Sequence, residues 1–135
     1  MTKITINAPD SHLAVRDFLN LVQKVWPGAY NPNKAATALE NTQNFTAWDG
    51  DILIGCARLL TDGYFFSTIP EILVDPAYQK MGIGKALMEK LWAHSPSSLA
   101  FGVQSGNEDF FEELGYEKGL PMYQRRKDRN QATPE

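Results

Sequence analysis

The spacing of apolar residues in the first part of the chain predicts one strand and two helices. Polar and apolar residues alternate over Lys3–Ile6, as in a half-buried strand. A helical spacing follows, opened by Asp10 or Ser11 as a cap and ended by the pair Pro27-Gly28. The apolar residues that share one face of this helix are Leu13, Phe18, Leu21, Val22 and Val25. After a turn-rich stretch, a shorter second helix is predicted over Lys34–Glu40.

The middle of the chain predicts a hairpin and then a long, interrupted strand. The hairpin strands are Phe45–Trp48 and Ile52–Leu60, joined by a turn at Asp49-Gly50, a pair that favours tight turns. A second turn leads into a strand over Tyr64–Val74. Pro70 lies inside this strand and cannot donate a ladder hydrogen bond, so we expect a bulge or bend beside it.

The last third of the chain predicts two helices and two strands. One helix begins at Gly82, and Pro96 prevents its continuation. The apolar residues on one face of this helix are Ile83, Leu87 and Leu91. A strand is expected over Leu99–Val103, a helix over 105–114, and a short strand over Met122–Arg126. Strands and helices that alternate in this way are typical of an α/β protein.

Composition places the chain among ordinary globular domains and excludes several classes of function. Its 135 residues, 43% of them hydrophobic, suit one domain, which we expect over residues 1–127 with a polar tail over 128–135. The net charge of −3 argues against nucleic-acid binding, since polyanion binders carry a basic excess. No apolar run is long enough to span a membrane and no leader precedes Lys3, so we expect a cytoplasmic protein.

The single cysteine and the two histidines offer little metal or thiol chemistry. Cys56 cannot form an intrachain disulfide, and its apolar neighbours indicate a buried thiol that packs as a small hydrophobic group. It lies far in sequence from both histidines, without the spacing of metal ligands. We therefore expect no metal site.

The segment after the apolar run Ile72-Leu73-Val74 has the features of a phosphate-binding loop. Gly82-Ile83-Gly84 stands at the start of a helix, where unpaired backbone N–H groups and the helix dipole attract anions. Glycines without a Cβ let an anion approach that backbone closely. A P-loop would need glycine at 79 and serine or threonine at 86, where the chain has Gln79 and Ala86. A dinucleotide fingerprint would need a small residue at 87, where it has Leu87, so both patterns fail.

A different pattern matches the same segment at every position. The spacing V-x-P-x-x-Q-x-x-G-x-G is filled by Val74, Pro76, Gln79, Gly82 and Gly84. It resembles the acyl-CoA loop of the GNAT superfamily of N-acetyltransferases. A weaker match is the stretch 107–116, which is similar to the family's C-terminal F-Y-E-x-L-G-F segment. The resemblance implies a single α/β domain whose mixed, mostly antiparallel sheet is flanked by helices and has splayed central strands.

The resemblance also implies acetyl-CoA as the acyl donor. The residues whose backbone would hold the pyrophosphate are Gln79, Lys80, Met81, Gly82, Ile83, Gly84 and Lys85. The pantetheine arm would pair with Ile72, Leu73 and Val74 like an added strand, which requires the strand over 99–103 to splay away. An N–H near Leu73 or Val74 would stabilise the oxyanion while an amine attacks the thioester directly, without an acyl-enzyme or a metal.

Proton handling is where the chain departs from the family pattern. Glu71 lies in a mostly apolar strand at a place where the family often has an acid, and burial makes a carboxylate a stronger base. We predict it as the catalytic base, the alternative being a carboxylate that faces solvent at a strand edge. Phe111 stands where the family has a tyrosine proposed to protonate the leaving thiolate, so we expect it to contact the pantetheine arm. Asn107 is expected either to bond the cofactor or to cap a helix.

The implied activity is transfer of an acetyl group from acetyl-CoA to a primary amine of a small molecule. Trp26, Tyr30 and Tyr64 are the expected acceptor-binding residues, because they lie on segments that shape the acceptor site in this family. A protein or peptide amine is one alternative, and a non-catalytic acyl-CoA sensor is another. A homodimer is possible, and neither nucleic acid nor a membrane is expected as a partner.

Overall fold

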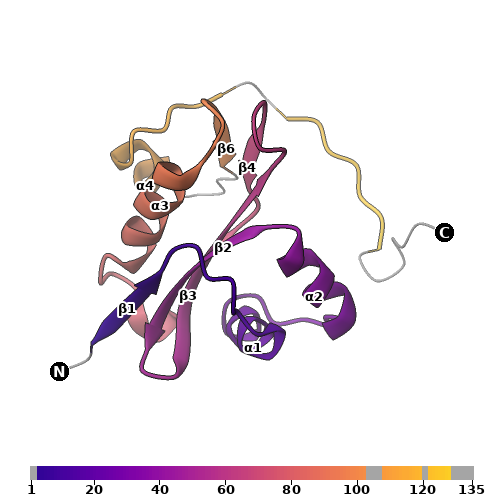
Figure 1. Ribbon diagram of the computed structural model, residues 1–135, viewed down its shortest axis with the longest axis vertical. Coiled ribbons are helices and arrows are strands. Elements are labelled where there is room, and N and C mark those ends of the chain that lie inside the picture. The colour runs from indigo at the N-terminus through magenta and orange to yellow at the C-terminus, as the bar shows by residue number, and fades with distance from the viewer. Residues whose placement is uncertain (1–2, 103–107, 120–121, 129–135) are drawn as a thin grey trace.

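The computed structural model describes residues 3–102, 108–119 and 122–128, and its centre is a six-stranded sheet (Figure 1). The strands are β1 (Ile4–Asn7), β2 (Gln43–Asp49), β3 (Ile52–Thr61), β4 (Ser67–Ile69), β5 (Ile72–Val74) and β6 (Ala100–Gly102). Their order is β1-β2-β3-β4-β6, with β5 also paired to β3. Among these strands only β4 and β6 run parallel. The predicted mixed, mostly antiparallel sheet is therefore confirmed.

Helices cover both faces of the sheet. α1 (Val15–Val25) and α2 (Pro32–Glu40) lie on one face, and α3 (Ile83–His94) and α4 (Glu108–Glu113) lie on the other (Figure 1). A 3₁₀ turn, η1 (Pro76–Tyr78), connects β5 to α3. No helix in the described part of the chain combines the length and apolar character needed to cross a membrane.

Each face of the sheet has its own apolar core. The buried residues on the α1 and α2 side are Phe18, Leu21, Val22, Leu39, Leu53, Cys56 and Leu73. The buried residues on the α3 and α4 side are Phe45, Ala47, Ile54, Ala57, Leu59, Ile69, Ile83, Leu87, Met88, Leu91 and Phe111. The predicted apolar faces of α1 and α3 are therefore the faces that are buried.

The predicted long strand is divided at Pro70. β4 and β5 both pair with β3, and Pro70 and Glu71 lie between them outside either strand, which confirms the predicted bend. β6 pairs with β4, and among the described residues no strand pairs with the edge of β5 that faces away from β3. The central strands are therefore splayed, and an open edge lies beside β5.

The prediction that Asp10 or its neighbour caps the first helix is wrong. The helix starts at Val15, and the Asp10 carboxylate instead accepts hydrogen bonds from Thr46 Oγ1 (2.6 Å), Trp48 Nε1 (3.3 Å) and the His12 N–H (2.9 Å). Burial opposes the ionisation of Asp10, but these bonds hold its pKa below the ordinary value. The carboxylate therefore fixes the segment before α1 onto β2.

Two predicted strand segments are not strands. The N–H groups of residues 64–66 donate to Asp62 Oδ1 at 2.8–3.1 Å, so these residues form a turn and β4 starts at Ser67. Residues 122–128 are exposed and without regular structure, so the predicted last strand over Met122–Arg126 is wrong. Only its first two residues are apolar or aromatic, which leaves little surface to bury against the sheet.

Candidate active site

The β5–α3 loop, residues 75–82, is anchored first by Asp75. This buried carboxylate accepts a hydrogen bond from the Ala77 N–H (2.9 Å) and so caps η1. Its other oxygen pairs with Lys24 Nζ of α1 at 3.1 Å. The Asp75 N–H donates to the Ile54 carbonyl on β3 at 2.8 Å. The Asp75 side chain thus stabilises the turn within the loop and connects the loop to α1.

Two further side chains, from the middle of the loop, hold it in place. The Tyr78 hydroxyl donates to Asp49 Oδ2 at the end of β2, and this bond is the main cause that raises the pKa of Tyr78. Gln79 Nε2 donates to the Val74 carbonyl at 3.3 Å. The glutamine of the recognised pattern therefore folds back onto β5.

The two glycines of the loop pattern serve different purposes. Gly82 precedes α3 with a φ of 79°, no side chain caps the helix there, and a Cβ at this position would have no heavy atom within 4 Å. The backbone before α3 is thus open to an approaching group. A Cβ on Gly84 would instead lie 3.4 Å from the Phe110 ring and 3.6 Å from the side chain of Ile72. Gly84 therefore permits close packing between α3, α4 and β5.

β5 presents backbone groups along its open edge. The Glu71 carbonyl accepts a hydrogen bond from the Arg58 N–H of β3 (3.3 Å), and the Asp75 N–H donates a hydrogen bond to the Ile54 carbonyl of β3 (2.8 Å). Alternate residues from 71 to 75 therefore bond toward β3. The N–H and C=O groups of Ile72 and Val74 therefore point to the open edge, whereas those of Leu73 point to β3. The expected oxyanion donor near Leu73 or Val74 thus has open N–H groups available at Ile72 and Val74, whereas the Leu73 N–H faces β3.

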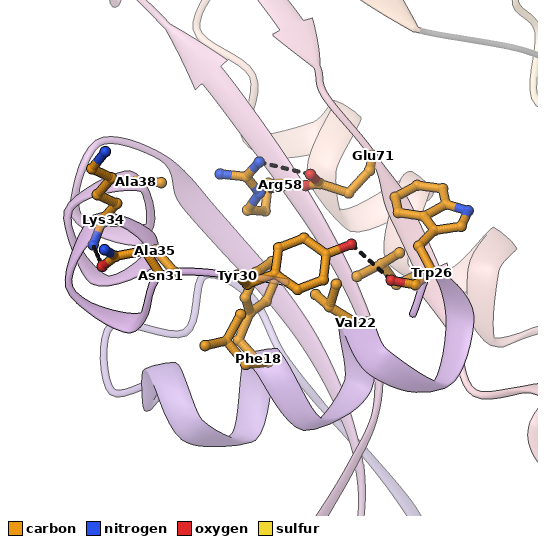
Figure 2. A pocket seen from close by; sticks show the side chains of 12 residues that line it. Phe18, Val22, Trp26, Tyr30, Asn31, Lys34, Ala35, Ala38, Arg58 and Glu71 are labelled. Atoms are coloured by element: carbon orange, nitrogen blue, oxygen red, sulfur yellow. Dashed lines mark hydrogen bonds and ion pairs between the residues drawn. The ribbon is translucent and has the colours of Figure 1, made fainter. Parts of the chain in front are cut away.

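A cavity of about 320 Å³ lies between α1, α2 and the strands β3 and β5 (Figure 2). We call it the α1–α2 cavity, and its lining residues are Phe18, Leu19, Val22, Trp26, Tyr30, Asn31, Lys34, Ala35, Ala38, Arg58, Glu71 and Leu73. Most of these side chains are apolar, and the charged ones come from α2, β3 and the bend before β5. Glu71 and Leu73 are directed toward this cavity while Ile72 and Val74 pack toward α3, as strand alternation requires.

Arg58 and Glu71 form an ion pair in the wall of the cavity. Both Nε and Nη2 of Arg58 donate to the carboxylate, the latter at 2.7 Å, and the two side chains are only about 15% exposed. Burial opposes the charge on Arg58, but Glu71 holds its pKa above the ordinary value. The guanidinium also lies over the Phe18 ring, 5.7 Å from its centroid. Glu71 is therefore a fixed, paired carboxylate rather than a solvated one.

Sequence reasoning missed Arg58 altogether. The available signal was an arginine in the otherwise apolar strand Ile52–Leu60, where an unpaired charge would be costly. Pairing it with Glu71 required the register of β3 against β5, in which the Arg58 N–H bonds the Glu71 carbonyl.

Two of the three expected acceptor-binding residues line the cavity. The Tyr30 hydroxyl donates to the Trp26 carbonyl at 2.7 Å, and Gln23 makes reciprocal hydrogen bonds with the backbone of Gly28 at 2.6 and 3.1 Å. Together these bonds fix the connection between α1 and α2, and Figure 2 shows the one between Tyr30 and Trp26. Tyr64 lies elsewhere, on the turn before β4, where it is 71% exposed.

The C-terminal motif contributes more to packing than to an open surface. Phe111 is buried and its ring lies so close to Gly102 that a Cβ there would be 2.7 Å away. Its neighbour Phe110 is the aromatic ring that reaches Gly84 at the start of α3. Asn107 lies outside the described residues.

Two other reactive groups are buried apart from the cavity. Burial raises the pKa of the Cys56 thiol far above its ordinary value, which fits the predicted packing role. The Tyr116 hydroxyl is buried without a hydrogen-bond partner among the described residues, and burial raises its pKa. The described residues hold no cluster of three potential metal ligands.

Comparison with known proteins agrees with the loop and the splayed sheet. The family model described as acetyltransferase (GNAT) domain matches residues 40–118. A segment of 69 residues is 42% identical to GCN5-related N-acetyltransferase 2, chloroplastic, of Arabidopsis thaliana, covering 48% of this chain and 27% of that relative. The part of the chain that matches thus spans only about a quarter of that plant protein's length.

Solved structures match over nearly the whole fold. A GNAT-family acetyltransferase from Streptococcus pneumoniae TIGR4 is 25% identical, with a TM-score of 0.74 over 93% of this chain and 100% of its own. A putative acetyltransferase from Deinococcus radiodurans R1 is 21% identical, with a TM-score of 0.78 over 93% of this chain and 94% of its own. Since the family model covers more than half of the sequence and the fold agrees, the chain belongs to the GNAT family of acetyltransferases, which are acyl-CoA-dependent transferases.

Proposed function

We propose that the protein transfers the acetyl group of acetyl-CoA to a primary amine of a small molecule bound in the α1–α2 cavity. The observation that carries the proposal is that one short segment faces both sites. Its residues Glu71 and Leu73 line the cavity, and its residues Ile72 and Val74 present backbone groups at the open edge of β5. An amine in the cavity would therefore meet a thioester held along β5. Reaction of two bound partners depends on this kind of proximity.

The β5–α3 loop and the open edge of β5 suit the donor. The backbone from Gln79 to Lys85 would hold the pyrophosphate at the start of α3, where Gly82 leaves open space. The amides of the pantetheine arm would pair with the backbone groups of Ile72 and the N–H of Val74, which point away from β3. The Val74 carbonyl already accepts a hydrogen bond from Gln79. Phe110, whose ring lies 3.4 Å from the position of a Cβ on Gly84, would also lie beside this path, and contact of Phe111 with the arm stays a prediction.

The chemistry is a direct attack by the amine. Its nitrogen forms a bond to the thioester carbonyl carbon, and the N–H of Ile72 or Val74 would stabilise the oxyanion. Glu71 accepts the proton that the amine loses, directly or through water. The C–S bond then breaks, and the CoA thiolate takes a proton from solvent, since Phe111 offers none. The products are the acetylated amine and CoA.

A small acceptor fits the shape of the cavity. It is closed on one side by the connection between α1 and α2, which Tyr30 and Gln23 hold in place. Its volume of about 320 Å³ suits a compact molecule rather than a folded protein surface.

Release of CoA thiol from acetyl-CoA in the presence of a panel of primary amines tests the proposal. We expect turnover with at least one small amine. The only protein thiol, Cys56, is buried and contributes little background. Thiol release with peptide amines alone would point to a protein acceptor. Binding of CoA without release from any amine would overturn the enzymatic role.

A further inference from the structure

The guanidinium of Arg58 has donors that Glu71 does not use. An arginine carries five N–H donors on three nitrogens, and here Nε and Nη2 bond Glu71. Nη1 makes no hydrogen bond to another described residue. Figure 2 shows a guanidinium nitrogen of Arg58 directed away from Glu71, toward the α2 side of the cavity. A half-buried cationic donor with no acceptor among the described residues is well placed to bind an anionic group of a ligand.

The charges around the cavity favour the same kind of ligand. The one carboxylate in its lining, Glu71, is already paired with Arg58. A polycation such as a polyamine would find no unpaired carboxylate in this lining and would lie against a guanidinium of the same charge. A ligand with its own negative charge would meet the remaining donors of that guanidinium.

The direct contact between Arg58 and Glu71 limits the spacing of charges on the ligand. Because their side chains are bonded at 2.7 Å, an ammonium at Glu71 and an anion at Arg58 must lie next to each other. An α-amino acid meets this condition, since one carbon atom separates its amine from its carboxylate. Most of the remaining lining is apolar and is formed by residues such as Phe18, Val22 and Ala38.

We infer that the acceptor is an α-amino acid with an apolar or aromatic side chain, whose carboxylate binds Arg58 Nη1 while its amine lies at Glu71. This inference rests on the proposed acetyl transfer and names its substrate class. Arg58 then sets specificity by holding the carboxylate, in addition to positioning Glu71. The apolar side chain of the substrate occupies the space between α1 and α2.

Four acceptors test the inference with the wild-type protein and acetyl-CoA: L-phenylalanine, L-phenylalaninamide, 2-phenylethylamine and 2-aminoethyl phosphate. We expect kcat/KM for phenylalanine to exceed that for the other three by at least tenfold. The amide is the sharpest comparison. Its amine loses a proton more easily once the carboxylate charge is gone, so a lower rate would not reflect amine ionisation.

Arg58→Gln, with Arg16→Gln as its matched control, tests whether Arg58 causes the preference for phenylalanine. Arg16 is an exposed arginine on α1 that does not line the cavity. The ratio of kcat/KM for phenylalanine over 2-phenylethylamine should fall to near one in Arg58→Gln and stay unchanged in Arg16→Gln. Arg58→Lys, which keeps the charge beside Glu71, should retain part of the ratio and serves if Arg58→Gln does not fold.

Each contrary result is distinguishable. Equal kcat/KM for phenylalanine and 2-phenylethylamine in the wild type would overturn the inference while leaving acetyl transfer intact. A higher kcat/KM for 2-aminoethyl phosphate than for phenylalanine would overturn the carboxylate assignment and indicate that Arg58 binds a phosphate. An unchanged ratio in Arg58→Gln would remove Arg58 from the assignment. CoA binding without thiol release from any of many amines would instead overturn the proposed function.

Discussion

The β5–α3 loop and the α1–α2 cavity lie on either side of one short strand but are built in different ways. The loop is a run of neighbouring residues whose useful groups are backbone N–H donors at the start of α3. The cavity is assembled from α1, α2, β3 and β5, and its useful groups are side chains. Arg58 and Glu71, its central pair, are 13 residues apart in the chain.

This difference predicts separate consequences for mutation. Changes to the loop act on the backbone path and should alter affinity for CoA. Changes to the cavity act on individual side chains and should alter turnover and selectivity. A loop substitution that alters only CoA affinity, or a cavity substitution that alters only turnover and selectivity, would support this separation. A substitution that alters both properties would show that the two regions are coupled.

The largest effect is expected for Glu71→Gln. If Glu71 accepts the amine proton, its loss should lower kcat by roughly 10²–10⁴, because the amide cannot act as a base. Affinity for CoA should barely change, since the donor contacts proposed on β5 are backbone ones. Steady-state rates and calorimetric CoA titration measure the two effects separately.

Glu89→Gln is the matched control, because Glu89 is an exposed carboxylate on α3. A wild-type rate in Glu71→Gln would remove Glu71 from the mechanism. A parallel loss of CoA affinity would mean that the Arg58–Glu71 pair also shapes β5.

A second prediction compares the two glycines of the loop. Gly82→Ala places a side chain at a φ of 79° in space left open at the start of α3, so CoA affinity should fall at least tenfold, or about 1.4 kcal/mol. Gly84→Ala adds a methyl at ordinary contact distance from Phe110 and should have a smaller effect. Calorimetric titration of both variants with CoA measures the two affinities. Unchanged affinity in Gly82→Ala would refute the assignment of the pyrophosphate site.

A third prediction concerns how the stabilising effect of Asp10, which fixes the segment before α1, depends on pH. The pKa of Asp10 is lowered in the folded protein, so its contribution to stability is present above its unfolded pKa of about 3.9 and is lost as pH falls below that value. Asp10→Asn should cost about 1 kcal/mol of unfolding free energy at neutral pH. Denaturant titrations from pH 7 down to 3 should show the two proteins converging. A constant gap across this range would mean that Asp10 is not stabilised as a carboxylate.

The smallest effect is expected for Lys24→Met, which removes the link between α1 and the loop. Lys24 is 47% exposed on its side chain, and such pairs contribute less than about 1 kcal/mol. Asp75 keeps its bond to Ala77, so CoA affinity should fall by no more than about threefold. Lys90→Met on α3 is the control. A tenfold loss specific to Lys24→Met would show that α1 is needed to hold the loop in shape.

Sequence reasoning was accurate where local geometry decides and failed where distant contacts decide. The strand, turn and helix around Gly82 are determined by residues next to one another, and the break at Pro70 follows from the proline itself. The local pattern predicts Asp10 as a helix cap, whereas its partners Thr46 and Trp48 are more than 30 residues away in the sequence. The strand predicted from Tyr64 instead begins at Ser67, because the N–H groups of residues 64–66 bond the Asp62 carboxylate and extend the turn.

The sequence by itself therefore determined the order of elements, the apolar faces of the helices and the loop pattern that identified the family, because periodicity and backbone freedom depend on neighbouring residues. Only the tertiary structure decided that Arg58 pairs with Glu71 and that Ile72 and Val74 present the open edge. Both depend on the register of β3 against β5, and pairing register between strands is a property of distant residues that must meet in space.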